Sequence, residues 1–318
     1  MLKKSIDFVG NIKTYIIISV TLILAGIIAT CVFGPVLDID FKGGTKLTYA
    51  YTGEIAHDDA EKAVKDVFKS AYNISGSSDL SGESQKLVIT LTDNISTETV
   101  DAAEKALQQA FPDNKIKSDE IISIDKSVGG RFFAKALVAV VIASVLVVLY
   151  VGIRFRKIGG ISAGITALIA LLHDILIAFF ACVVFRLPID ANFIAVVLTL
   201  LGYSLNDTII IYDRVRENRR MYGTKMPLAE MVNKSNNETL ARSVLITVAT
   251  LSAVIVIIIV SEIKGLTSLR SFTIPLAIGL VAGSYSSICL APCLWVKWKE
   301  RSNAKIALKS RTKKNKKA

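Results

Sequence analysis

The chain has 318 residues, of which 52% are hydrophobic, and its mean hydropathy is +0.51. These values exclude an ordinary soluble domain and place the chain among membrane proteins. The formal net charge of +11 would favour a nucleic-acid partner in a soluble protein, so the position of the basic residues along the chain decides what that charge means.

Six stretches of the chain are long and apolar enough to cross a membrane as helices, which requires about 20 mostly apolar residues. Four of them have an uncharged interior, whereas the third and fourth along the chain contain ionisable residues. No small-x-small cleavage site follows the first stretch, so we expect it to be a retained anchor rather than a signal peptide. The expected spans are residues 15–34, 132–153, 158–185, 191–212, 240–261 and 270–296.

Basic residues mark one side of the membrane. They gather before the first span, in the turn at 154–157, between the fourth and fifth spans and after the sixth. By the positive-inside rule, the 1–14 segment, the 213–239 loop and the 297–318 tail are cytoplasmic. We expect the tail to lie against anionic lipid headgroups, and no nucleic-acid partner, because aromatic residues do not alternate with the tail's charges. Within the loop, Leu228–Val232 is expected to form a short surface helix.

Residues 35–131 separate the first two spans and are acidic, which predicts a folded domain on the external side. A serine- and glycine-rich segment at 73–82 is expected to be a loop. Apolar residues alternate with the period of strands in three places and with the period of helices in two. The predicted strands cover 47–51, 87–91 and 122–124, and the predicted helices 60–71 and 100–111. We expect a small two-layer α/β domain of the ferredoxin-like kind.

The sequence offers no sign of cofactor or metal chemistry. It lacks a phosphate-cradling G-x-x-x-x-G-K-[ST] motif and zinc-type spacing of His and Cys, and it contains only two His. We therefore expect no enzymatic activity, no cofactor and no metal. The four cysteines all lie in apolar stretches, where they are expected to be packing residues rather than a disulfide framework: Cys31, Cys182, Cys289 and Cys293.

Asp207 is the main candidate for a functional residue in the membrane. An ionisable group in hydrocarbon costs ~2.5–3.5 kcal/mol on insertion scales, so it requires a partner or a role. Asp207 precedes Asp213 by less than two helical turns, which places it roughly 9 Å inside the cytoplasmic end of the fourth span. Burial favours the protonated form, so Asp207 is suited to carry a proton. Alternatively, Asp207 and Asn206 hydrogen-bond across the helices and only hold them together.

Two further ionisable residues in the membrane have two interpretations each. Arg242 begins the uncharged part of the fifth span at about the depth of Asp207, so it either pairs with that carboxylate or extends to the headgroups. Asp174 lies near the middle of the third span and is either structural or a second relay point. Its neighbour His173 is expected to be a packing residue, since the two cannot form an i, i+4 pair.

Glycines occur at positions that predict close packing or a joint. Gly202 in the fourth span and Gly279 and Gly283 in the sixth are expected to permit close helix contacts. Gly43 and Gly44 follow the first span, just before the first predicted strand. They either form a turn or let the external domain swing.

The chain resembles the SecF proteins of the SecD/SecF family over nearly all of its membrane part. The segments that carry the resemblance are DIDFKGGT, LLHDILIAFF, LGYSLNDTIIIYDRVREN, TLARSVLITVATL and LAIGLVAGSYSSICLAP. The resemblance implies that Asp207 and Arg242 are the family's key acid and base. It also implies that the family motif after the first span comprises Asp40, Phe41, Gly43, Gly44 and Thr45.

The resemblance further implies a polytopic α-helical protein that forms half of a twelve-helix bundle of the resistance-nodulation-division kind. The implied partners are SecD, the SecYEG channel and a translocating unfolded polypeptide in the bacterial cytoplasmic membrane, with the proton-motive force promoting late-stage export. The coupling ion is a proton or sodium, since a buried carboxylate suits either. Two alternatives remain open: an exporter subunit of the resistance-nodulation-division type, and a passive structural partner of SecD.

Overall fold

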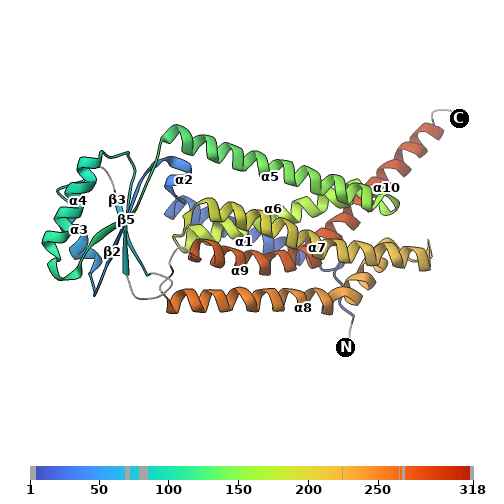
Figure 1. Ribbon diagram of the computed structural model, residues 1–318. Helices are drawn as coiled ribbons and strands as arrows, with labels where there is room; N and C mark the ends of the chain where they lie inside the picture. The colour runs from blue at the N-terminus through green and yellow to red at the C-terminus, as the bar shows by residue number, and fades with distance from the viewer. Residues whose placement is uncertain are drawn as a thin grey trace.

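The computed structural model describes residues 5–68, 72–78, 85–223, 225–264, 266 and 269–315. Six of its helical segments are long and apolar enough to cross a membrane, as the sequence predicts. They run side by side, with an α/β domain at one end and both chain termini at the other (Figure 1). The spans are α1 (Ile12–Phe33), α5 (Lys126–Arg154), α6 (Gly160–Val184), α7 (Ala191–Tyr222), α8 (Leu228–Ile263), and α9 (Arg270–Tyr285) with α10 (Ala291–Asn315).

The middle of the bundle is formed by α6, α7 and α9. Helix α6 packs against α1, α5, α9 and α10, and α7 and α8 both pack against α9. A π-helical turn, Ser286–Leu290, joins α9 to α10. In contrast, α1, α5 and α8 expose most of their large apolar side chains, such as Ile17, Ile153 and Leu245. Such surfaces are stable only against lipid or another protein.

Several helices extend well beyond the expected spans. Helix α8 already begins at Leu228, so the predicted short surface helix is its first turn, and α10 continues through much of the predicted tail. Hydropathy locates the bilayer rather than the helix end, so charged helical extensions were missed. The extensions of α7 and α8 are held together by an Arg214–Glu238 ion pair of 2.6 Å and by Asn218, which donates to Ser235 Oγ over 2.9 Å.

The α/β domain is a four-stranded antiparallel sheet covered by two helices. The strand order is β3-β4-β2-β5, and the element order β-α-β-β-α-β is that of ferredoxin-like domains. Both helices lie on the side of the sheet away from the spans (Figure 1). The elements are β2 (Gly44–Tyr51), α3 (His57–Val64), β3 (Tyr72–Ser78), β4 (Gln85–Leu91), α4 (Thr97–Ala110) and β5 (Lys117–Ile124).

The predicted loop at 73–82 was wrong over its first part, because Tyr72–Ser78 forms the edge strand β3. Its remainder lies outside the described residues. Among the described strands it pairs only with β4, with Ile74 opposite Ile89. Its serines and glycine have low strand propensity, so sequence pattern missed it. The predicted helix at 60–71 is also shorter, since α3 ends at Val64, and residues 69–71 lie outside the described part.

A packed joint connects the first span to the sheet. Strand β1 (Val36–Leu37) pairs in parallel with β6 (Pro188–Ile189), and helix α2 (Ile39–Lys42) follows. Gly43 and Gly44 then have φ values of +77° and +135°. A Cβ atom on Gly43 would lie 2.6 Å from the Cα atom of Lys126 in α5. Both glycines are thus required by backbone conformation and close approach.

We expect Gly43→Ala to destabilise the protein more than Gly34→Ala. A positive φ costs a non-glycine residue roughly 1–2 kcal/mol, and Gly34 shares this conformation at +67° but has open space around it. The difference between the two variants therefore reports the backbone clash with Lys126. Thermal denaturation of the purified full chain measures this difference in stability. Equal melting temperatures for the two variants would show that the backbone at residue 43 can move away from Lys126 at no cost in stability.

Candidate functional site between the membrane helices

Asp207 lies in α7, on the face that packs into the bundle. Its side chain is 0% exposed, and neither carboxylate oxygen has a hydrogen-bond partner within the described residues. A buried polar group without a partner costs free energy, and an unpaired charge costs far more. An ionised Asp207 without a partner at this position would therefore be costly.

The neighbour of Asp207 across the helix contact is the antiparallel helix α8. Tyr203 donates to Thr247 Oγ1 over 3.0 Å one helical turn before Asp207, and Arg214 pairs with Glu238 about two turns after it. Ser243 is one turn from Thr247, just as Asp207 is one turn from Tyr203, so the two residues lie at the same level. Ser243 is also fully buried, and its hydroxyl has no partner within the described residues.

Asp174 in α6 differs from Asp207, because it is the centre of a hydrogen-bond network. One carboxylate oxygen lies 3.1 Å from His173 Nδ1, and the other accepts hydrogen bonds from Ser204 Oγ at 2.9 Å and Ser286 Oγ at 2.8 Å. Asp174 is 0% exposed. The network thus joins α6, α7 and the π-helical turn through one carboxylate.

Two more hydroxyl groups extend this network towards Asp207. Ser287 lies 3.2 Å from Ser204 Oγ, and Thr208, the residue after Asp207, donates to Ser287 Oγ over 3.2 Å. The wider π-helical turn lets the consecutive residues Ser286 and Ser287 both face the network. Such turns occur frequently at functional sites.

The structure does not bring Arg242 or Asn206 to Asp207. Arg242 is exposed and has no ion pair or hydrogen bond to any described residue, whereas the next residue, Ser243, faces α7. A helix turns by about 100° per residue, so the inward position of Ser243 directs Arg242 outward. Asn206 is likewise exposed on α7. The Asp207–Arg242 pair is therefore not formed within this chain.

The packing glycines also differ from one another. A Cβ atom on Gly279 would lie 2.4 Å from Leu200 Cδ1, so Gly279 permits close contact between α9 and α7. At Gly283 a Cβ atom would make an ordinary contact of 3.5 Å with Asp174 Oδ2. The prediction for Gly202 is not met within this chain, because Gly202 is exposed on the same side of α7 as Asn206 and has no atoms near its missing Cβ.

The residues of the DFKGGT segment lie at the joint rather than near the carboxylates. Asp40 accepts a hydrogen bond from the backbone of Ala191 at the start of α7, and Phe41 stacks on Phe132 of α5. Thr45 donates to the backbone oxygen of Asp93 over 3.2 Å. This segment therefore links the α/β domain to the ends of α5 and α7.

Sequence reasoning did not join the hydroxyl residues of the network to Asp174, since single serines in apolar spans are common. It also treated His173 as a packing residue, whereas its Nδ1 atom contacts Asp174. The sequence feature that could have indicated this network is the clustering of polar residues in the fourth and sixth spans. These hydroxyl residues are Ser204, Thr208, Ser286 and Ser287.

The comparisons with known proteins agree with this architecture. The model of the family "Protein export membrane protein SecD/SecF, C-terminal" matches residues 102–301. The protein translocase subunit SecF of Alicyclobacillus acidocaldarius is 33% identical over 309 residues, which cover 96% of each chain. The protein translocase subunit SecDF of Bacillus subtilis is 32% identical over 93% of this chain but only 38% of its own length.

Solved structures of SecDF share the fold. The crystal structure of SecDF in its super-membrane-facing form has a TM-score of 0.66 at 25% identity, covering 97% of this chain and 41% of that one. SecDF from Thermus thermophilus, titled a translocon-associated membrane protein, has a TM-score of 0.77 at 24% identity, with coverages of 94% and 39%. This chain thus spans about two fifths of the SecDF chains. It belongs to the SecD/SecF family of protein-export membrane proteins.

Proposed function

We propose that the chain is an accessory subunit of the Sec protein-export machinery of the bacterial cytoplasmic membrane. In this proposal it acts with a SecD partner, beside the SecYEG channel, and uses the proton-motive force to promote late-stage translocation of polypeptides. The names of its relatives, which are translocase subunits, support the export role. Both termini and the loop between α7 and α8 are assigned to the cytoplasm on account of their basic residues.

One observation carries the coupling part of the proposal. Asp207 is completely buried at membrane depth with neither oxygen hydrogen-bonded within the described residues. A buried carboxylate with a structural role is held by hydrogen bonds, as Asp174 is. A carboxylate that takes up and releases an ion must be able to exist without such hydrogen bonds. Asp207 is therefore the group that we assign to the coupling ion, which in this proposal is a proton.

The exposed position of Arg242 supports a partner that completes the site. Arg242 lies on the side of α8 that also exposes Leu245, Val256 and Ile259. A cation in such an apolar surface is stable in the membrane when another protein or a water-filled cavity covers it. Since the matched part is about two fifths of a SecDF chain, SecD is the partner that we propose for this surface.

Export in living cells tests the proposal against its alternatives. Cells depleted of their own SecD and SecF would receive this chain together with its cognate SecD, and the release of a labelled secreted protein would be followed over time. We expect release to be restored only when both chains are present. Unrestored release combined with lower accumulation of small toxic compounds would instead identify an exporter of the resistance-nodulation-division type.

A further inference from the structure

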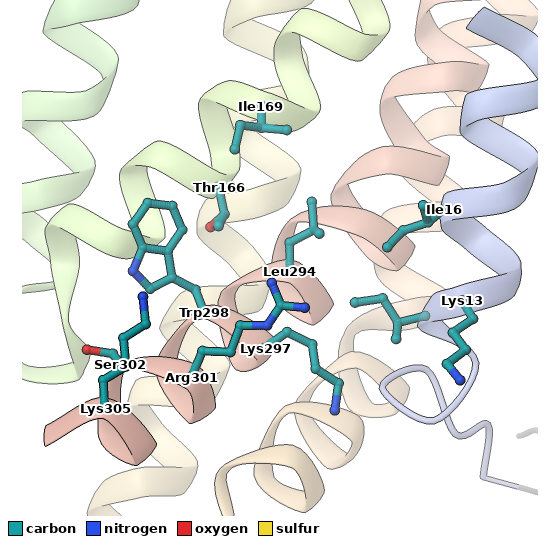
Figure 2. A pocket seen from close by; sticks show the side chains of 11 residues that line it. Lys13, Ile16, Thr166, Ile169, Leu294, Lys297, Trp298, Arg301, Ser302 and Lys305 are labelled. Carbon is teal, nitrogen blue, oxygen red and sulfur yellow. The ribbon is translucent and has the colours of Figure 1, made fainter. Parts of the chain in front are cut away.

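A groove of about 650 Å³ opens between α1, α6 and α10, near the end of the bundle that holds both termini. Figure 2 shows Ile16 and Ile169 on one side of it, and Lys297, Arg301 and Lys305 on the other. The groove lies away from Asp207 and from the Asp174 network, and none of their residues lines it. It therefore requires an explanation of its own.

Positive charge is concentrated at one edge of the groove. Lys297, Arg301 and Lys305 are spaced four residues apart and share one face of α10, while Lys13 comes from α1. No acidic side chain is among the residues that line it. Lys297 has an exposed ion pair with Glu300 at 3.0 Å, but Lys13, Arg301 and Lys305 pair with no acidic group in the described part of the chain. Four cations in one place favour an anionic ligand.

The other part of the groove is apolar. Ile16 of α1 and Ile169 of α6 are 39% and 45% exposed, and Leu294 of α10 lies beside them. Trp298, at 43% exposed, stands between the apolar and the basic parts. Tryptophan is enriched at the boundary between hydrocarbon and headgroups. The groove thus combines an apolar wall with a basic edge.

We propose that this groove binds one anionic phospholipid of the cytoplasmic leaflet. Its phosphate would lie among Lys13, Lys297 and Arg301, and one acyl chain would follow Ile16 and Ile169. Basic pockets between helices on the cytoplasmic side have the chemistry that recognises such headgroups. A lipid in this place bridges α1 and α10, the first and last membrane helices of the chain. A free phosphate would leave the apolar wall uncovered.

Quenching of tryptophan fluorescence by brominated lipid tests the proposal. The full chain would be placed in phosphatidylcholine vesicles that contain increasing amounts of brominated phosphatidylglycerol. The sequence has two Trp, of which Trp295 is 0% exposed. The Trp298→Phe variant retains only Trp295, so the difference between the normal chain and this variant gives the signal of Trp298. We expect half-maximal quenching of Trp298 at a much lower content of brominated phosphatidylglycerol than of brominated phosphatidylcholine.

Charge removal at the groove should abolish that preference. Each cation near an anionic lipid surface contributes roughly a fivefold gain in affinity, so Lys13→Gln, Lys297→Gln and Arg301→Gln together should weaken phosphatidylglycerol binding more than tenfold. A matched control removes as many charges elsewhere on the same side, with Arg219→Gln, Arg220→Gln and Lys225→Gln. We expect this control to retain the preference, and equal losses in both variants would overturn the proposal.

A second variant and a soluble competitor complete the quenching experiment. Should the triple variant fold poorly by circular dichroism, Arg301→Gln with Lys305→Gln, both on the exposed part of α10, provides the same measurement. Glycerol phosphate at millimolar concentration distinguishes a lipid from a free phosphate. We expect it not to relieve the quenching, because it lacks acyl chains, and full relief would contradict a lipid site.

Discussion

Replacement of Asp207 by Asn is expected to reduce export to the level of cells that lack the chain. Asparagine keeps the size of the side chain but cannot take up or release a proton. Because neither oxygen of Asp207 is hydrogen-bonded within the described residues, the substitution breaks no hydrogen bond among them. The variant should therefore accumulate and copurify with SecD normally, while the release of a labelled secreted protein slows as in the depleted strain.

Glu217→Gln is the matched control for this prediction. Glu217 is an exposed carboxylate on the same helix, paired with Arg214 at the surface, and surface ion pairs contribute only ~0–1 kcal/mol. This variant should export at the normal rate. If Asp207→Asn also exported normally, Asp207 would be a structural residue and the chain a passive partner of SecD.

Replacement of Asp174 by Leu is expected to destabilise the folded chain by about 2–4 kcal/mol. Leucine removes the acceptor for the hydroxyl groups of Ser204 and Ser286 and the contact with His173. Each buried group left unsatisfied costs about 1–3 kcal/mol, reduced here because the two serines retain other contacts and because hydrogen bonds in membranes are worth somewhat less. Thermal denaturation of the purified chain in detergent measures the loss.

Asp174→Asn provides the comparison, because an amide accepts from both serines and offers a donor to His173 Nδ1. We expect this variant to melt close to the normal chain and clearly above Asp174→Leu. Equal melting temperatures for the two variants would show that the network contributes no stability and would remove the structural explanation for Asp174.

The number of membrane helices could be predicted from sequence because hydropathy alone identifies an apolar span. The described part of the chain has six helices that are long and apolar enough to cross a membrane, as predicted. The ends of the helices could not be predicted, since α8 and α10 continue into charged segments, where ion pairs and packing rather than hydropathy stabilise the helix. Strand β3 was missed for a related reason: its residues are polar, and its pairing with β4 decides its conformation.

The candidate site could be predicted only in part. An aspartate in an apolar span is visible in the sequence, so Asp207 and Asp174 were both identified. Their difference was not visible, because it depends on which hydrogen-bonding groups the fold brings to each carboxylate. Two serines and a histidine contact Asp174, whereas no described residue hydrogen-bonds to Asp207. The outward direction of Arg242 depends in turn on which face of α8 meets α7.

The response of late-stage export to an imposed proton-motive force tests the central claim most directly. Inverted membrane vesicles would carry SecD with either the normal chain or Asp207→Asn, and completion of a partly translocated protein would be measured with and without a proton gradient. We predict acceleration by the gradient with the normal chain and none with the variant. Equal acceleration in both would contradict the assignment of Asp207 to the coupling ion.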